Sequence, residues 1–439
     1  MKLQLVIAPA PEEYLKIPRY ACFPPLDLLS LASYVKIKMP QVEVEILDGQ
    51  ILGTGNILNL LSADFVGISP RISNYQESLE IARKAKETGA TVVMGGAYAT
   101  QMAKQILLAR SEVDFIVAGD GEHALAALLR ETEPAVIPNL HWRGEAGSIH
   151  LNRIEYLPLD SLPLVDNSLV DLTLYQENFA MAYLHLGNGP AICTCSQKGC
   201  KWRAKNGGCI FCGRMHPGWR ARPPKAVWAE IQCAVKNLGV DFVWDVSDAF
   251  TSDKSWLREF ASAKPPGINP GLMIQARADE LDEETVDLLA DTNCKRVLVG
   301  VESGDEQLLT ACGKGTTPLQ NLGAASGLAR RGIEMFPSFV IGLPGETHST
   351  LESTYRHAQQ LLEFGLIAEI QALPFMPITG SSALAQIGAP ATDALDLDAL
   401  KREWIKNRTA VSYQEVMETA DKIKALSRPK GTSYENIYK

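Results

Sequence analysis

The stretch CTCSQKGCKWRAKNGGCIFCGR, residues 193–214, holds five of the chain's nine cysteines. Thiolates gathered in one short window are typical metal ligands. Cys209 and Cys212 form a C-x-x-C pair, and residues 201–208 separate Cys200 from that pair. Three thiolates in this spacing suit a cubic iron–sulfur cluster whose fourth iron stays open to a substrate or cofactor.

Zinc and disulfides are the competing interpretations of these cysteines. Zinc prefers four ligands, and Cys193, Cys195 or His216 could complete such a set. Disulfides belong to oxidising compartments, but the opening MKLQLVIAPAPEEY, residues 1–14, lacks the pattern of a secretion leader. We therefore expect reduced cysteines in a cytoplasmic protein and favour iron–sulfur over zinc.

Composition narrows the class of protein. The chain has 439 residues, of which 46% are apolar and 21% charged, and its formal net charge is −9. This is a globular composition with enough length for two cores. No apolar stretch reaches the roughly 20 residues of a membrane helix, and the negative charge disfavours nucleic acid as the main ligand. We expect an enzyme that acts on a small molecule or peptide.

Strands and helices alternate over the first part of the chain, which predicts a doubly wound, Rossmann-like parallel sheet. Ligands of such sheets sit at the carboxyl ends of the strands. Three strands end in suitable loops, namely Ser69-Pro70-Arg71, GGAYAT at 95–100 and GDGE at 119–122. Each could be a simple turn, but three on one edge favour a binding face. Neither a G-x-G-x-x-G nor a P-loop motif is present. The expected strands are 3–7, 42–47, 65–69, 91–94 and 115–118, and the expected helices 28–38 and 76–87.

A second series of strand–helix units follows the cysteines and predicts a partial (β/α)6 barrel of the TIM type. Its strands are expected at 241–246, 272–276, 296–301, 334–341 and 368–373. The sequence thus divides into an N-terminal domain at 1–135, a proline-rich linker at 136–185, the barrel at 186–380 and a helical extension at 381–439.

Polar residues stand where the barrel strands are expected to end, and they can face one cavity. Helix capping is the alternative role for Ser247 and Ser303, and also for Asp248, Asp305 and Thr347. The residues at the strand ends are Ser247, Gln275, Arg277, Glu302 and Ser303.

The order of these motifs resembles that of radical S-adenosylmethionine enzymes. The resemblance rests on QKGC at 197–200 with CIFCGR at 209–214, on VLVGVESGDEQLL at 297–309 and on SFVIGLPGET at 338–347. The preceding YACFPPLDLLSLASYV at 20–35, with GGAYAT and GDGE, is similar to the cobalamin-binding domain of one large branch, the class B radical methyltransferases.

The resemblance implies three cofactors, a [4Fe–4S] cluster, S-adenosylmethionine and cobalamin, and an electron donor such as flavodoxin or ferredoxin. Cys200, Cys209 and Cys212 would hold the cluster. S-adenosylmethionine would contact Phe211, Ser247, Gln275, Arg277, Glu302 and Ser303. Cobalamin would contact Ser69, Arg71, Tyr75, Gly95, Gly96, Tyr98, Thr100, Gly119, Gly121 and Glu122.

Two departures from the family pattern stand out. Members usually place three residues between the first two cluster cysteines, whereas eight separate Cys200 from Cys209 here; Cys195 could replace Cys200 in another loop arrangement, and a part for Cys193 stays open. The D-x-H-x-x-G signature of cobalt ligation is absent, and Tyr98 stands where many relatives carry a histidine. This implies a cobalt without a protein histidine, shielded by Arg71 or Tyr75, or a domain that has lost cobalamin.

The expected activity is methylation of an unactivated carbon of a specialised metabolite or peptide, through a 5′-deoxyadenosyl radical and methylcobalamin. One alternative keeps both cofactors but performs oxidation, cyclisation or ring contraction. A second is a methylthiotransferase, although such enzymes hold another cluster through three N-terminal cysteines and residues 1–135 contain only Cys22. A corrinoid carrier without catalysis is the non-enzymatic alternative.

Overall fold

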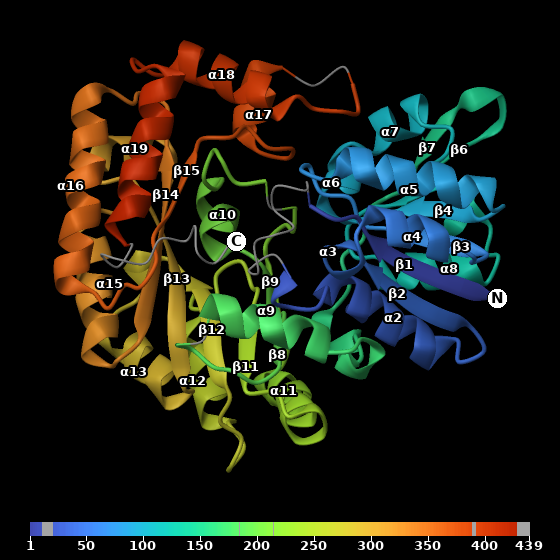
Figure 1. The fold of residues 1–439 in the computed structure, drawn as a ribbon, viewed down its shortest axis with the longest axis horizontal. Helices are drawn as coiled ribbons and strands as arrows, with labels where there is room; N and C mark the ends of the chain where they lie inside the picture. The colour runs from blue at the N-terminus through green and yellow to red at the C-terminus, as the bar shows by residue number, and fades with distance from the viewer. Residues whose placement is uncertain (11–20, 184, 214, 389–391, 428–439) are drawn as a thin grey trace. The chain divides into compact units, whose positions relative to one another are not determined.

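The computed structural model describes residues 1–10, 21–183, 185–213, 215–388 and 392–427. Two compact units share the chain. Unit 1 comprises residues 1–194, 229–241 and 390–395, and unit 2 comprises 195–228, 242–389 and 396–439. Figure 1 shows both units as ribbons.

The sheet of unit 1 has the order β2-β1-β3-β4-β5-β6-β7. The strands β1 to β5 pair in parallel, whereas β6 and β7 pair antiparallel at one edge. This confirms the doubly wound sheet expected from the sequence and adds two strands to it. The strands are β1 (Lys2–Ile7), β2 (Glu43–Asp48), β3 (Phe65–Ile68), β4 (Thr91–Met94), β5 (Phe115–Val117), β6 (Leu140–Arg143) and β7 (Ile149–Leu151).

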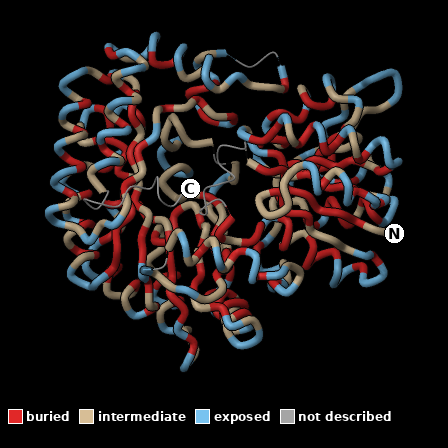
Figure 2. Tube along the Cα trace, viewed as in Figure 1, coloured by how far each residue is buried: buried red, intermediate tan, exposed pale blue. Residues whose placement is uncertain are grey.

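Helices cover both faces of this sheet, because successive side chains of a strand point to opposite faces. In β1, Val6 belongs to the apolar core beneath α5 and α7. Leu5 and Ile7 belong to the core beneath α2 and α8. Figure 2 shows the sheet as a buried layer. The helices are α2 (Leu26–Lys38), α3 (Gly49–Leu52), α4 (Thr54–Leu60), α5 (Tyr75–Glu87), α6 (Gly96–Gln101), α7 (Ala103–Ala109) and α8 (Glu122–Leu129).

The segment 136–185, interpreted from its prolines as a linker, contains regular structure. It supplies β6 and β7 to the sheet and carries α9 (Thr173–Tyr183). Both strands are too short for their periodicity to stand out between prolines. Short 3-10 turns also occur in this region or directly before it, at Pro134–Val136, Glu145–Gly147, Leu159–Ser161 and Asn167–Leu169.

The second large sheet has six strands in the order β15-β14-β13-β12-β11-β8, and β11 to β15 are parallel neighbours in chain order. Each expected strand of the partial barrel is present, which confirms that part of the prediction. The sequence reading missed β8, which contains Cys193. The strands are β8 (Ala191–Thr194), β11 (Phe242–Asp245), β12 (Gly271–Ala276), β13 (Cys294–Glu302), β14 (Glu334–Ile341) and β15 (Gln371–Pro374). A separate ribbon pairs β9 (Gln197–Gly199) with β10 (Trp219–Ala221).

Helices line the outer side of this sheet (Figure 1). They are α11 (Pro224–Leu238), α12 (Lys254–Ser262), α13 (Glu283–Asp291), α14 (Glu306–Ala311), α15 (Pro318–Arg330) and α16 (His348–Phe364), with a 3-10 turn at Ala278–Glu280. Cys22, Cys294 and Cys312 are buried, as expected for core or cap residues, but Cys233 is exposed on α11 and corrects that expectation.

The expected C-terminal helices are α17 (Ser382–Ile387), α18 (Leu397–Arg408) and α19 (Tyr413–Leu426). The basic end of the predicted extension, 428–439, lies outside the described residues. Within the described part of the chain, every helix is too short or too polar to cross a membrane.

Candidate functional site

The three predicted cluster cysteines lie on one loop of unit 2. Cys200 precedes α10 (Lys201–Asn206), and Cys209 and Cys212 follow it. The Cys200 N–H donates to Gly218 O at 3.1 Å, and the Cys212 N–H donates to Cys209 O at 3.0 Å. All three residues are partly exposed, whereas Cys193 is buried. The loop therefore carries three cysteines on a backbone held by its own hydrogen bonds.

The three thiols match the donor set of a cluster. A four-iron cluster takes one thiolate per iron, and Cys200, Cys209 and Cys212 can supply three of the four. Burial raises the pKa of the Cys209 thiol to about 12, and the nearby Lys314 ammonium opposes that rise. This cation favours the thiolate that a cluster needs.

Cys195, the alternative ligand, lies in a different environment. Its Sγ donates to Gln197 O at 3.3 Å, and burial raises the pKa of its thiol to about 12. Ligation by Cys195 would require this contact to break. The choice between Cys195 and Cys200 stays a prediction that variants can test.

Asp245 organises the carboxyl end of β11. The Ser247 N–H donates to Asp245 Oδ1 at 2.9 Å, and the Ser196 N–H donates to Oδ2 at 3.2 Å. Burial raises the pKa of Asp245. Ser247 Oγ also accepts from the Gln197 N–H at 2.9 Å. Ser247, a predicted contact of S-adenosylmethionine, is thus buried in an internal network rather than capping a helix.

Arg277 and Glu302 come together through Lys314, which the sequence reading missed. Lys314 Nζ contacts Glu302 Oε1 at 2.9 Å, and only 8% and 7% of the two side chains are exposed. Arg277 Nη2 donates to Lys314 O at 2.8 Å. Burial disfavours the charged ammonium, but the adjacent Glu302 carboxylate outweighs it, so the pKa of Lys314 is raised. Two predicted contacts of S-adenosylmethionine therefore share Lys314 as a partner: Glu302 contacts its ammonium and Arg277 its carbonyl.

The backbone at Glu302 is strained. Its φ of 62° lies in the left-handed region, which is costly for residues other than glycine. Such strain persists where surrounding structure enforces it and often marks functional sites. A shift of register between β13 and β14 occurs at the same place. The chain thus departs from regular strand geometry where it presents the Glu302 carboxylate.

Replacement of Gly300 by alanine should disrupt the Glu302–Lys314 pair. A Cβ at Gly300 would lie 2.3 Å from Glu302 Oε1 and 2.5 Å from Lys314 Nζ. Separating a buried ion pair and overpacking its site cost about 2–4 kcal/mol. We expect a lower denaturation midpoint and weaker binding of S-adenosylmethionine. Alanine at Gly323, where a Cβ meets nothing within 4 Å, is the matched control; equal effects of the two substitutions would contradict the expectation.

The other predicted contacts of S-adenosylmethionine are Ser303, Gln275 and Phe211. Ser303 Oγ lies 3.0 Å from Thr354 Oγ1 and accepts from the Asp305 N–H. Gln275 and Phe211 are partly exposed. Asp305 and Thr347 cap α14 and α16, as the capping interpretation expected.

The C-terminal extension braces the loop that follows β14. Trp404 Nε1 donates to Gly342 O at 3.1 Å and stacks on Phe375 at a centroid distance of 4.4 Å. The Gly345 N–H donates to Arg408 O, and the Ala410 N–H to Glu346 O, both at 2.8 Å. The sequence did not predict this role of the extension.

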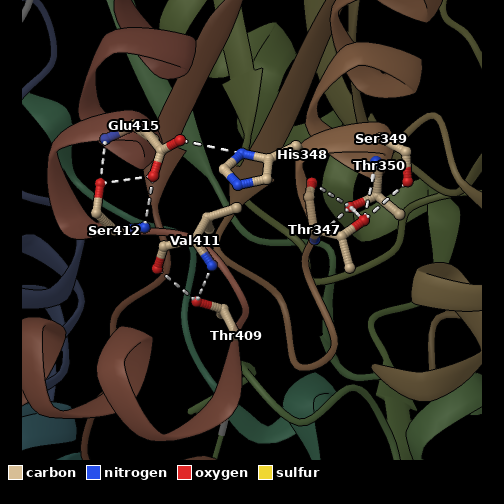
Figure 3. A network of polar contacts seen from close by, with 8 residues as sticks. All are labelled: Thr347, His348, Ser349, Thr350, Thr409, Val411, Ser412 and Glu415. Carbon is tan, nitrogen blue, oxygen red and sulfur yellow. Dashed lines mark hydrogen bonds and ion pairs between the residues drawn. The ribbon is translucent and has the colours of Figure 1, made fainter.

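Contacts between the first residues of α16 and α19 further fix the extension to this loop. Figure 3 shows His348, the first residue of α16, facing Glu415 of α19, with Nδ1 and Oε1 3.0 Å apart. Glu415 also completes a capping box with Ser412, and Thr347 caps α16 beside it. These contacts join the start of α19 to the end of the GLPGET loop.

The predicted cobalamin loops of unit 1 lie at one edge of its sheet. The Gly95 N–H donates to Ile68 O at 3.0 Å, and the Gly119 N–H donates to Thr100 Oγ1 at 3.1 Å. Gly96 has φ +81°, and a Cβ there would lie 3.0 Å from Ser69 Oγ. The three loops are therefore neighbours, as expected from a parallel sheet. Arg71 is exposed beside them.

Glu122 gives a specific reason to place cobalamin at this edge. Ser30 Oγ donates to Glu122 Oε1 at 2.8 Å, but the buried Oε2 has no partner among the described residues. A buried acceptor is normally satisfied by protein, water or ligand. Cobalamin carries amide side chains whose N–H groups can supply that donor, so the residues present fit the cofactor.

Tyr75 and Tyr98 are held by Asp393, which the chain contributes from a point far along the sequence. Tyr75 Oη donates to Asp393 Oδ2 at 2.6 Å, and Tyr98 Oη donates to the Asp393 carbonyl at 2.5 Å. Arg110 Nε pairs with Asp393 Oδ2 at 2.6 Å. Burial, with Asp393 next in effect, raises the pKa of Tyr98 to about 12. Neither phenol is disposed to ionise as a metal ligand would.

The residues that sequence reading missed share one property. Asp245, Lys314 and Asp393 each bind at least one residue that is not a near neighbour in the chain, namely Ser196, Glu302 and Arg110. Lys314 alone had a visible signal, because it stands between two glycines in CGKG, residues 312–315.

Comparison with known proteins identifies both halves. Residues 196–358 match the model of the radical SAM superfamily, and residues 15–129 match that of the B12 binding domain. An uncharacterized methyltransferase of Pyrococcus horikoshii is 25% identical over 82% of this chain and 78% of its own. The anaerobic magnesium-protoporphyrin IX monomethyl ester cyclase of Cereibacter sphaeroides is 28% identical over 66% of this chain, but the match spans only 48% of the cyclase.

Solved structures agree in fold. The cobalamin-dependent radical enzyme OxsB superposes with a TM-score of 0.71 at 17% identity, covering 97% of this chain and 66% of that one. The radical methyltransferase TsrM from Kitasatospora setae gives 0.69 at 20% identity, covering 89% and 77%. A radical SAM domain implies a [4Fe–4S] cluster and S-adenosylmethionine, and a B12 domain implies cobalamin. The chain therefore joins a B12-binding domain to a radical S-adenosylmethionine domain.

Proposed function

We propose that this enzyme methylates an unactivated carbon of a specialised metabolite or peptide. The observation that carries the proposal is the union, in one chain, of a three-cysteine loop on a radical SAM domain with a B12-binding domain. Relatives named as methyltransferases, from Pyrococcus horikoshii and Kitasatospora setae, support that choice of reaction.

Unit 2 would bind the cluster and S-adenosylmethionine, and unit 1 would bind cobalamin. Cys200, Cys209 and Cys212 would hold the cluster, and Arg277 with the Glu302–Lys314 pair would orient S-adenosylmethionine beside it. Glu122 and the loops at Ser69, Gly95 and Gly119 would hold cobalamin. When bound, the cluster supplies the electron that cleaves the sulfonium, and cobalamin carries the methyl group. The protein contributes distance, orientation and exclusion of water.

Product analysis tests the proposal. Methylation consumes two molecules of S-adenosylmethionine: one gives its methyl group and leaves S-adenosylhomocysteine, and the other accepts an electron and a substrate hydrogen and leaves methionine and 5′-deoxyadenosine. Anaerobically reconstituted enzyme, given a chemical reductant and candidate substrates, should release both nucleosides with a product heavier by one methylene. Product formed without S-adenosylhomocysteine would exclude methylation.

A non-methylating reaction with the same cofactors is the second candidate. The match to the anaerobic magnesium-protoporphyrin cyclases favours it, because those relatives are named for ring closure. In that case the mass spectrum would show oxidation or ring formation and no added methyl group. A methylthiotransferase is disfavoured, since Cys22, the one cysteine in residues 1–135, is buried.

A further inference from the structure

The insertion in the cluster loop folds as a defined element. Residues 201–206 form α10, which begins directly after Cys200. The helix ends at Gly207, whose φ of 81° and ψ of −11° place it in the left-handed conformation. Gly208 also has a positive φ and leads into Cys209. The first two cluster cysteines therefore stand at the two ends of a short helix that ends at a glycine.

Lys201 of α10 pairs with Asp253, and Trp202 reaches the segments that hold the predicted S-adenosylmethionine contacts. Its Nε1 donates to Gly313 O at 2.9 Å. Its ring covers Gly315, where a Cβ would lie 2.3 Å from the indole. The Arg277 guanidinium lies over the same ring at 4.2 Å, a cation–π contact. One side chain of the insertion thus contacts both a predicted ligand-binding arginine and the turn at 312–315.

The turn at 312–315 is fastened to the cluster loop at several points. Cys312 O accepts from the Ile210 N–H at 3.0 Å, and Cys209 Sγ lies 3.7 Å from Gly313 O. Gly313 has φ +74°, and a Cβ there would lie 2.7 Å from Gly208 O. The two segments pack backbone against backbone, so movement of the cluster loop moves this turn.

The turn also determines where the predicted S-adenosylmethionine contacts lie. Its Lys314 carbonyl accepts from Arg277, and its Lys314 ammonium pairs with Glu302. Three groups therefore hold Arg277: the Trp202 ring, the Lys314 carbonyl and the Asp279 carboxylate, whose Oδ1 lies 3.0 Å from Arg277 Nε. Supporting contacts of this kind fix the orientation of functional groups in many sites.

We propose that Trp202 is a positioning residue that sets the affinity of the site for S-adenosylmethionine without being needed to assemble the cluster. The proposal rests on the proposed function only as far as cluster and S-adenosylmethionine binding. The insertion then acts as a clamp that aligns Arg277 and the Glu302–Lys314 pair with the cluster loop.

The test compares three variants of the full chain after anaerobic reconstitution. Trp202→Ala removes ring and donor, Trp202→Phe keeps the ring over Arg277 but removes the hydrogen bond to Gly313, and Lys205→Ala changes an exposed residue of the same helix. Iron and sulfide per chain report the cluster. Equilibrium dialysis with labelled S-adenosylmethionine and the electron paramagnetic resonance change of the reduced cluster on its addition report binding.

We expect Trp202→Ala to keep its iron and raise the Kd for S-adenosylmethionine roughly tenfold or more, as for supporting residues of other sites. Trp202→Phe should fall between it and the parent, and Lys205→Ala should match the parent. Unchanged Kd in both tryptophan variants, or loss of the cluster from both, would overturn the proposal. If the alanine variant alone fails to fold, an unchanged Kd in Trp202→Phe overturns it.

These outcomes separate the positioning role from the proposed reaction. If the parent binds the cluster and S-adenosylmethionine but methylates nothing, the proposed function fails. The Kd values of the Trp202 variants still decide whether Trp202 is a positioning residue.

Discussion

Replacement of Cys200 by alanine should abolish cluster assembly and reduce cleavage of S-adenosylmethionine to background. The residue stands at the start of α10, partly exposed, across the insertion from the C-x-x-C pair. With two thiolates left, a cubane would lose one of its three protein ligands, and the cluster whose open iron would bind S-adenosylmethionine would not be held. Cys209→Ala and Cys212→Ala should behave alike. Iron analysis and visible absorption after anaerobic reconstitution measure the effect.

Cys195 and Cys193 provide the matched controls. Both lie in or next to β8, where Cys193 is buried and Cys195 Sγ donates to Gln197 O. Alanine at either position should leave iron content and 5′-deoxyadenosine release near parent levels, because neither thiol is needed as a ligand. A full cluster in Cys200→Ala, together with its loss in Cys195→Ala, would transfer the ligand role to Cys195.

Much of the architecture could be predicted because its signals are local. The strands β1, β4 and β14 are found within a residue of their expected bounds, since apolar runs bounded by glycine or charged residues report strands directly. The family motifs lie at strand ends for the same reason: a parallel sheet gathers its loops at one edge. The sequence order of loops therefore predicted their meeting in space.

The rest depends on contacts that leave no local pattern. Trp202 contacts Gly313, and Asp393 pairs with Arg110, 283 residues away in the chain. In the sequence, Trp202 is one aromatic residue of an insertion and Asp393 is one carboxylate among many. Likewise β6 has four residues and β7 has three, too few for a periodic pattern, so only their pairing in the sheet reveals them.

Replacement of Asp393 by alanine should destabilise unit 1 and weaken its hold on cobalamin. The side chain is 5% exposed and pairs with Arg110 and the Tyr75 hydroxyl. Its removal leaves a guanidinium and a phenol without their acceptor, at a cost of about 2–4 kcal/mol. Tyr75 opens α5, and Tyr98 lies in α6, within the segment 95–100 that is predicted to bind cobalamin. Loosening of both helices should lower the cobalamin retained after gel filtration.

Hydrogen exchange of the cobalamin-free protein locates this effect. Peptides covering α5 and α6 should exchange faster in Asp393→Ala, while those of α12 and α13 in unit 2 should not change. Asp393→Asn should be milder, because its amide oxygen can still accept from Tyr75. Asp398→Ala, which removes an exposed surface pair with Lys401, should be nearly neutral. Equal protection of α5 and α6 in all three variants would contradict the role given to Asp393.

The stability of unit 1 should depend on pH through the charge of Asp393. Burial opposes ionisation of Asp393, but the hydrogen bonds from Arg110 and Tyr75 outweigh it, so its pKa is lowered in the folded chain. A carboxylate with a lowered folded pKa contributes stability that is complete above its unfolded pKa, about 3.9, and is lost as pH falls through the folded value. The parent should therefore lose protection of α5 and α6 on acidification, and the difference between parent and Asp393→Asn should shrink as the carboxylate protonates. A difference that persisted unchanged below the folded pKa would show that packing of residues 392–395, rather than the charge on Asp393, holds the two tyrosines.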